Sequence, residues 1–183
     1  MAGHSFTTER LLLRPMQLSD AARVYEMYSD DDVVQFIGER ARHASVDDAR
    51  TFIDAMEQKY AKWNAPIQVY AICDRAADDR YIGTGLLKYL PLSDGQGDSD
   101  ELEVGWHLAR ECWGKGFATE AGRGLLQQAF ALLDVDDMWT VVNEGNAGSL
   151  AVVERLGLEP LGKTTKYYDE ELLLFRTPRE AWT

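Results

Sequence analysis

The alternation of apolar and polar residues predicts a chain in which β-strands and α-helices follow one another several times. Period-2 runs bounded by turn residues indicate strands, and apolar residues three or four positions apart indicate amphipathic helices. The clearest helix start is the capping-box sequence Ser45-Val46-Asp47-Asp48, followed by apolar residues at helical spacing up to Tyr60. The expected strands are 9–15, 67–73, 81–90, 101–108, 138–142, 159–166 and 172–176, and the expected helices are 19–28, 45–60, 116–133 and 149–156.

The order of these elements predicts the fold class. The strands 67–73 and 81–90 read as a hairpin, the last two strands as another, and the helix 116–133 connects two strands in a β-α-β crossover. Antiparallel hairpins combined with one crossover are typical of an α+β domain. We therefore expect a single α+β domain, residues 1–183, with a mixed central β-sheet flanked by helices on both faces.

Three segments carry finer predictions. In the strand 101–108, apolar side chains are expected on one face, and the other face is expected to carry Glu101, Glu103, Gly105 and His107. The helix 116–133 is expected to bury a stripe of Phe117, Ala121, Leu125, Ala129 and Leu132. The segment 91–100 is rich in Ser, Gly and Asp, which is typical of a mobile loop.

Composition and charge narrow the function classes. The chain has 183 residues, 45% of them apolar, which is ordinary for one globular domain. Its 31 acidic and 19 basic residues give a formal charge of −12, which disfavours nucleic-acid binding but suits cationic acceptors and leaves room for a local basic pocket. Residues 1–8 lack the apolar core of a signal peptide, and no stretch approaches about 18 apolar residues, so we expect a cytoplasmic protein that does not enter membranes.

Cysteine and histidine content argues against a disulfide framework or a metal site. Cys73 and Cys112 are the two cysteines of the chain, which suits a reducing compartment. The three histidines, His4, His43 and His107, lie far apart in the sequence. We therefore expect no metal.

The segment Trp113-Gly114-Lys115-Gly116-Phe117-Ala118-Thr119-Glu120 is the most informative part of the sequence. It lies between a strand and a strong helix, so the unpaired N–H groups and the dipole at the helix start favour an anion there. A tight strand-to-helix turn is the alternative. Neither common phosphate-loop fingerprint is complete, because Phe117 follows Gly116 where a Walker loop needs lysine, and Thr119 occupies the place of the last small residue of a dinucleotide loop.

Two further features are expected at the same end of the sheet. Gly105 interrupts its strand and predicts a bulge that leaves main-chain groups of residues 106–108 unpaired for a ligand, with a plain bend as the alternative. Asn146 and Ser149 precede a short helix, either as ligand contacts or as caps. Because ligands bind outside the carboxyl ends of strands in such crossover units, we expect these features to meet the glycine loop.

Taken together, these motifs resemble the Gcn5-related N-acetyltransferases (GNAT), and within them the RimJ/RimL-type branch. The resemblance extends over nearly the whole chain, from Thr8–Pro15 to the closing segment 172–182, and the internal motifs are specific in this order and spacing. The internal segments that carry it are Glu103–Leu108, Trp113–Ala121, Asn146–Ser149 and Glu154–Leu158.

The resemblance implies acetyl-CoA as the co-substrate. Its pyrophosphate would lie on the glycine-loop amides, its pantetheine arm along the strand edge, and Asn146 would contact that arm. The cofactor-binding residues expected from the resemblance are Trp106, His107, Leu108, Trp113, Gly114, Lys115, Gly116, Phe117, Ala118, Thr119 and Asn146. Two positions depart from the family pattern: Trp113 replaces the usual Arg or Gln of the loop, and Val153 stands where many relatives carry a tyrosine that protonates the leaving thiolate.

Attack on a thioester needs a neutral amine, so a base acting directly or through water is expected. Glu103, which precedes the strand glycine as in relatives, is the first candidate, and Glu101 and His107 compete with it. A solvent-facing carboxylate and a structural histidine are the alternative interpretations. Ser149 is the candidate general acid in the absence of the tyrosine, with a helix N-cap as its alternative.

The sequence therefore predicts an enzyme that moves an acetyl group from acetyl-CoA to a primary amine by direct attack in a ternary complex. A protein N-terminus is the first candidate acceptor. Acetylation of a small amine or antibiotic and a non-catalytic, CoA-binding regulatory role are the alternatives. A homodimer is compatible with the five Trp and eight Tyr, which could equally belong to the core.

Overall fold

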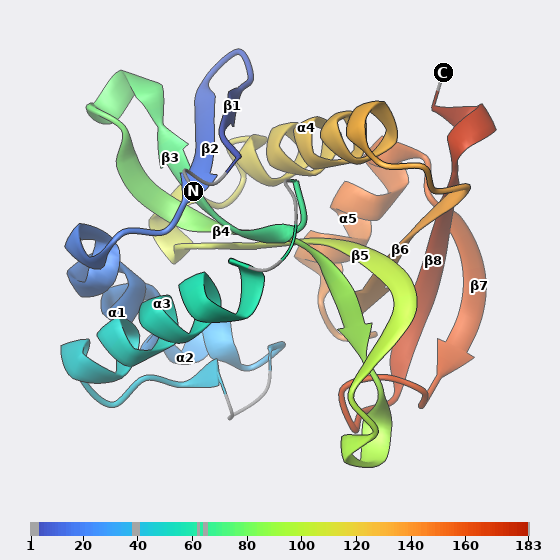
Figure 1. Cartoon of the computed structure of the whole chain (residues 1–183), viewed down its shortest axis with the longest axis horizontal. Coiled ribbons are helices and arrows are strands. Elements are labelled where there is room, and N and C mark those ends of the chain that lie inside the picture. The colour runs from blue at the N-terminus through green and yellow to red at the C-terminus, as the bar shows by residue number, and fades with distance from the viewer. Residues whose placement is uncertain (1–3, 38–40, 62, 64–65, 183) are drawn as a thin grey trace.

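The computed structural model describes residues 4–37, 41–61, 63 and 66–182, and these form one eight-stranded sheet (Figure 1). The strand order is β1-β2-β3-β4-β5-β6-β8-β7. β5 and β6 pair in parallel and the other neighbours pair antiparallel, so the sheet is mixed as predicted. The strands are β1 (Phe6–Thr7), β2 (Leu11–Pro15), β3 (Gln68–Asp74), β4 (Arg80–Pro91), β5 (Asp98–Leu108), β6 (Asp137–Val142), β7 (Glu159–Thr164) and β8 (Leu172–Pro178).

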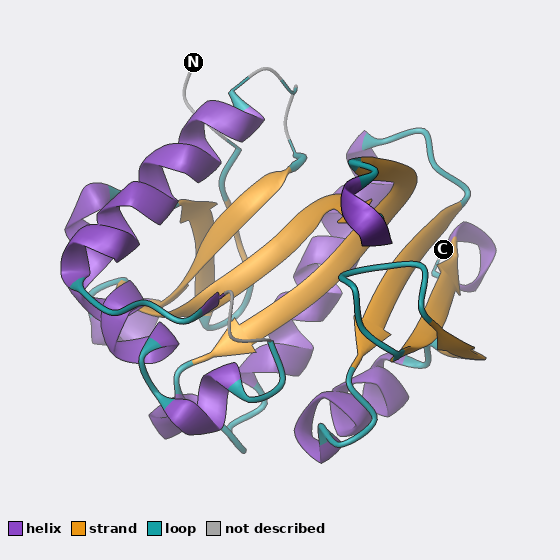
Figure 2. Cartoon of the chain, turned by 90° about the horizontal axis from the view of Figure 1, so that it is seen from below, coloured by secondary structure: helices purple, strands orange, loops and turns teal. Residues whose placement is uncertain are grey.

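Helices cover both faces of this sheet, which confirms the predicted α+β architecture (Figures 1 and 2). α1, α2 and α3 lie together on one side, and α4 and α5 lie on the other. The predicted domain limits, 1 and 183, lie outside the described residues. The helices are α1 (Ala21–Tyr28), α2 (Asp31–Val34), α3 (Val46–Tyr60), α4 (Phe117–Leu132) and α5 (Ala147–Leu156).

Strand alternation divides the core between the two helical layers. In β3, Tyr70 and Ile72 are fully buried in the cluster under α4, whereas Ala71 and Cys73 are fully buried in the cluster under α1 and α3. Both faces of the central strands are therefore apolar, as a sheet covered on two sides requires. Each large aliphatic side chain buried in this way contributes about 1.5–3 kcal/mol to folding.

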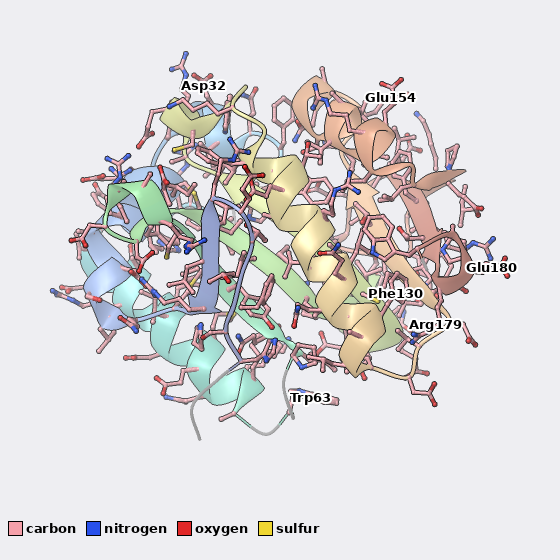
Figure 3. All side chains as sticks on the ribbon, turned by 90° about the horizontal axis from the view of Figure 1, so that it is seen from above. Asp32, Trp63, Phe130, Glu154, Arg179 and Glu180 are labelled. Atoms are coloured by element: carbon pink, nitrogen blue, oxygen red, sulfur yellow. The ribbon has the colours of Figure 1, made fainter. Side chains whose placement is uncertain are left out.

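Arg179 closes the end of α4 (Figure 3). Its guanidinium donates to the carbonyl oxygens of Phe130, Leu133 and Val135 at 2.6, 2.6 and 2.9 Å. A cation that binds the last carbonyls of a helix satisfies them and complements the helix dipole. This contact ties the C-terminal segment to the helix that begins at the glycine loop.

The structure corrects several details of the predicted elements. Leu132 is 52% exposed rather than buried, because α4 ends there and Leu133 packs against the core instead. β1 and α2 were not predicted, since each is shorter than five residues. Ser19 does not begin α1; it lies in a 3₁₀ turn, Leu18–Asp20, and α1 starts at Ala21.

The predicted loop 91–100 is largely ordered by strand pairing and by contacts with the β7–β8 turn. β4 extends to Pro91, and β5 begins at Asp98. Between them, the amide of Ser93 donates to the Lys166 carbonyl at 2.9 Å, and the amide of Asp94 donates to Asp169 Oδ1 at 2.7 Å. Sequence composition missed this because the partners lie more than 70 positions away.

Within the described ranges, none of the helices combines the length and the apolar character that crossing a membrane would require.

Candidate active site

β5 and β6 separate after a brief contact, and the gap between them forms the site. Their register contains one described residue pair, Glu103 opposite Trp139. The Thr140 hydroxyl donates to the Val104 carbonyl at 2.8 Å. Past this point β5 continues to Leu108 without a parallel partner among the described residues, so one edge of the strand stays open to a ligand.

The open edge does not come from a bulge, so that prediction is wrong. Gly105 lies opposite Leu86, and the β4–β5 register runs through this region without a shift. A Cβ on Gly105 would lie 3.0 Å from Leu86 Cδ1. The glycine thus leaves room for the Leu86 side chain of β4. The edge is exposed by the divergence of two strands that are distant in sequence.

Main-chain groups of alternate β5 residues point into the gap. The Val104 carbonyl accepts from Thr140, and the Leu108 carbonyl accepts from the Trp113 indole Nε1 at 2.8 Å, both outside the β4–β5 ladder. Since groups two positions apart point the same way, the N–H and C=O of Trp106 also face the gap. The main chain of Trp106 thus offers a ligand one hydrogen-bond donor and one acceptor. The Leu108 carbonyl already accepts a hydrogen bond from the Trp113 indole.

His107 faces the opposite way along the main chain. Its carbonyl oxygen points toward β4, where it would lie 2.3 Å from a Cβ on Gly83. His107 therefore contributes its side chain, rather than the main-chain groups that the resemblance suggested.

A cavity of about 1090 Å³ connects this gap with the start of α4. That volume lies slightly above the usual range of small-molecule sites, which is about 300–1,000 Å³. Ser149 lines it, and so do all the predicted cofactor-binding residues except Lys115. The lining residues that were predicted are Trp106, His107, Leu108, Trp113, Gly114, Gly116, Phe117, Ala118, Thr119, Asn146 and Ser149.

The glycine loop has the geometry of an anion cradle. Gly114 and Gly116 have φ values of 71° and 81°, the left-handed region that glycine tolerates best. Gly116 is the N-cap of α4, so the amides of the first helical turn face the cavity unpaired by helix carbonyls. The Thr119 hydroxyl is buried there with no protein partner in the described structure. This orphaned hydroxyl and the glycine cradle fit a phosphate group.

Arg10 holds the loop from outside the cavity, a contact that the sequence analysis missed. Its Nε lies 2.6 Å from Glu120 Oε2, and its Nη1 donates to the Lys115 carbonyl at 2.9 Å. The Glu120 carboxylate also accepts from the Thr8 hydroxyl at 2.5 Å. The corner between β1 and β2 is thereby fixed to the glycine loop and the first turn of α4.

A second cavity of about 70 Å³ adjoins the first and contains Glu103 in its wall. The Glu103 side chain is only 5% exposed, so it is not the solvent-facing carboxylate of the alternative interpretation. Its Oε2 accepts from the Tyr168 hydroxyl at 2.5 Å and lies 2.9 Å from Lys88 Nζ. Burial and the adjacent carboxylate raise the pKa of Tyr168, so its hydroxyl keeps its proton and donates. Lys88 compensates the carboxylate charge.

Glu101 lies outside both described cavities. Its carboxylate is bound by Lys166 Nζ at 2.7 and 2.8 Å and by the Tyr167 hydroxyl at 2.8 Å. Despite partial burial, these hydrogen bonds lower the pKa of Glu101. The structure therefore places Glu103, and not Glu101, beside the gap.

The His107 side chain lines both cavities. Its Nδ1 lies 2.9 Å from the Tyr28 hydroxyl oxygen. Burial lowers the pKa of His107 to about 4, although the Glu103 charge acts in the opposite direction. The imidazole is therefore neutral at physiological pH.

The turn after β6 brings Asn146 and Ser149 to the junction of the two cavities. Asn146 is the N-cap of α5, and its Oδ1 accepts from the Ser149 amide at 3.0 Å. Ser149 is thus the third helical residue rather than the cap, and its hydroxyl has no hydrogen bond to a described residue. Val153 is buried in the core and lines neither cavity.

No group of three or more His, Cys, Asp or Glu side chains able to hold a metal ion occurs among the described residues.

Comparison with known proteins identifies the family. The model of the acetyltransferase (GNAT) domain matches residues 10–159, so this chain belongs to the GNAT acetyltransferases. It is 28% identical over 160 residues to the uncharacterized N-acetyltransferase p20 of Bacillus licheniformis, covering 87% of this chain and 85% of p20.

Solved structures share the fold. A probable acetyltransferase is 24% identical with a TM-score of 0.79, and covers 98% of this chain and 99% of its own. RimL, a ribosomal L7/L12 alpha-N-protein acetyltransferase solved with coenzyme A, is 13% identical with a TM-score of 0.77, and covers 97% and 99%. At these identities the likeness concerns the fold.

Proposed function

We propose that this GNAT acetyltransferase transfers the acetyl group of acetyl-CoA to the α-amine at the N-terminus of a protein or peptide, in a ternary complex in the cytoplasm. The observation that carries the proposal is the joining of two cavities at the β5–β6 gap. One has an anion cradle and a strand edge, and the other has a buried carboxylate.

The large cavity would hold the donor. The amides of Gly116 to Thr119 and the Thr119 hydroxyl would bind its pyrophosphate, and the main chain of Trp106 would pair with its amide-containing arm. Bound acetyl-CoA supplies an activated thioester. The likeness to the fold of RimL, whose structure holds coenzyme A, supports this donor and the RimJ/RimL-type branch.

The small cavity would receive the acceptor amine. The Glu103 carboxylate is held through its Oε2 oxygen. Its other oxygen, Oε1, lies on the side of Gly105, and both residues line the small cavity. We assign Glu103 as the base that accepts the amine proton through water. Ser149 lies at the junction of the cavities. We assign its hydroxyl as the candidate group that donates a proton to the departing thiolate.

The charge of the small cavity favours an amine that is already neutral. Lys88 compensates Glu103, and His107 is neutral, so this wall carries no net negative charge to hold an ammonium ion. At pH 7.5 a terminal α-amine of pKa about 7.8 is roughly one-third neutral, whereas a lysine amine of pKa about 10.4 is about 0.1% neutral. An N-terminal α-amine therefore fits better than a lysine or polyamine.

The test compares acceptors at pH 7.5 by CoA release. One peptide carries a free α-amine and no lysine; the matched control is the same sequence with a blocked N-terminus and one lysine, and spermidine represents small amines. We expect kcat/KM for the free α-amine to exceed the others by about 100-fold or more, following the neutral fractions. Preference for lysine or spermidine would overturn the acceptor assignment, and acetyl-CoA binding without any transfer would indicate a non-catalytic binding module.

A further inference from the structure

A chain of buried hydroxyl groups ends at the His107 imidazole. His107 Nδ1 lies 2.9 Å from the Tyr28 hydroxyl oxygen, and the Tyr28 hydroxyl donates to Thr84 Oγ1 at 3.0 Å. Thr84 Oγ1 lies 2.7 Å from the Tyr81 hydroxyl, which donates to Met27 Sδ at 3.8 Å. These groups come from α1, β4 and β5, and Tyr28, Thr84 and Tyr81 are all buried.

Counting protons along this chain fixes the histidine tautomer. Each hydroxyl has one proton to donate. The Tyr28 hydroxyl gives its proton to Thr84 Oγ1, whichever of Thr84 and Tyr81 donates in the bond between those two. The Tyr28 oxygen then accepts, and the proton of the neutral imidazole must lie on Nδ1. His107 Nε2 is left with its lone pair.

The side chain that carries this Nε2 lone pair lies where the two cavities meet. His107 lines both cavities where they join, and Nε2 has no hydrogen-bond partner among the described residues. Among the described residues, Nε2 is therefore an acceptor without a partner, on a side chain that lies between the proposed donor cavity and the proposed amine cavity.

We propose that His107 Nε2 accepts a hydrogen bond from the attacking amine, and that Tyr28 is the positioning residue that fixes the tautomer. This rests on the proposed amine acetylation. One amine N–H points to Nε2, which leaves the nitrogen lone pair to attack the thioester carbon. The N–C bond forms as the C–S bond breaks. The amine proton passes through water to Glu103 and finally to the thiolate, giving an amide and a thiol.

This role differs from that of a general base. Burial keeps the pKa of His107 near 4, so the imidazole orients the amine and stabilises positive charge on its nitrogen without taking the proton. Glu103 and Lys88 are the charged groups that face it, acting in opposite directions. A donor tautomer would instead repel the N–H of the amine.

Three variants test the proposal. Tyr28→Phe removes the hydroxyl that holds Nδ1–H, His107→Leu removes the acceptor, and His107→Gln restores an acceptor oxygen. Tyr70→Phe is the matched control, because Tyr70 is also a buried tyrosine, but its hydroxyl donates to the Pro66 carbonyl at 2.6 Å outside this chain. Circular dichroism and melting temperature of each variant report whether it folds.

The readouts are the ¹⁵N chemical shifts of the His107 ring, the amine kcat/KM and the acetyl-CoA Kd. We expect Nδ1–H in the wild type and a mixture of tautomers in Tyr28→Phe, with amine kcat/KM reduced about 3- to 10-fold. His107→Leu should lose more amine kcat/KM, and His107→Gln should recover part of it, and the acetyl-CoA Kd of each variant should change less than its amine kcat/KM does. A wild-type Nε2–H tautomer, or a switched tautomer without a change in kcat/KM, would overturn the proposal.

If no amine is acetylated by the wild type, the proposed function fails, while the tautomer measurement still decides the hydrogen-bond assignment.

Discussion

Lys88 and Glu103 form an ion pair at the edge of the small cavity, with 2.9 Å between Nζ and Oε2 and side-chain exposures of 14% and 5%. The pair joins adjacent strands, since the two residues lie opposite each other in the β4–β5 register. Tyr168 completes the arrangement from the β7–β8 turn. The candidate base is therefore held in place by charge and by a long-range hydrogen bond.

The first prediction concerns the effect of breaking the Lys88–Glu103 ion pair on stability and on turnover. Glu103→Gln leaves the Lys88 charge without its buried partner, which typically costs about 3–5 kcal/mol, and Lys88→Met/Glu103→Gln should recover much of that. Both should slow turnover by about 10²–10⁴ at neutral pH if Glu103 is the base, and the defect should shrink as pH rises. Urea unfolding and pH–rate profiles measure the two effects. Recovery of activity together with stability in the double variant would show that Glu103 is structural.

The second prediction concerns the cofactor loop. Gly116→Val places a β-branched residue at φ 81°, with its Cβ 3.4 Å from Arg10 Nη2, and should weaken acetyl-CoA binding severely. Gly157→Val is the matched control, because Gly157 has φ 71° with nothing within 4 Å of its Cβ and does not line the cavity. Calorimetry should give a large loss of affinity for the first variant only. Equal acetyl-CoA affinity in both folded variants would remove the loop from the site.

The third prediction separates capping from chemistry in α5. Asn146→Ala removes the N-cap and should cost about 1 kcal/mol of stability. Ser149→Ala leaves that cap in place, so its melting temperature should stay near the wild-type value while turnover falls about 10-fold, if the hydroxyl assists the leaving thiolate. Thermal unfolding and steady-state kinetics on the two variants are sufficient. Wild-type turnover in Ser149→Ala would exclude a catalytic hydroxyl.

The fourth prediction concerns acid stability. Because the pKa of His107 is about 4 in the fold and about 6.5 in an unfolded chain, the unfolded state binds the additional proton between these values. The free energy of unfolding should therefore fall as pH decreases from 6.5 to 4. Burial also lowers the pKa of His43, which contributes in the same direction. His107→Gln should show a shallower fall than the wild type in urea titrations at each pH, and parallel curves would contradict the His107 contribution.

Local patterns predicted much of the fold. The alternation in β5, the capping box at Ser45 and the stripe of α4 each depend on neighbours within a few positions, and the structure has these elements. The glycine loop was predicted for the same reason, because helix-start chemistry is local. The location of the cavity followed from the topology that these elements imply.

The parts that the sequence did not reveal depend on distant contacts. Lys88 meets Tyr168 across 80 positions, and Arg10 meets Glu120 across 110. Such pairs leave no periodic signal. Gly105 gave a local signal, but the edge opens because β5 and β6 diverge, a relationship between strands separated by α4. The tautomer of His107 likewise depends on hydroxyl groups from two other elements, α1 and β4.

The most direct test of the account is mass spectrometry of a peptide incubated with the protein and acetyl-CoA carrying a ¹³C-labelled acetyl group. The peptide should contain a free N-terminal amine and one internal lysine, and Gly116→Val serves as the control protein. We predict one labelled acetyl group on the N-terminal amine, with release of CoA, for the wild type and far less for the control. Label on the lysine alone, or no label on the peptide while acetyl-CoA binds, would contradict the central claim.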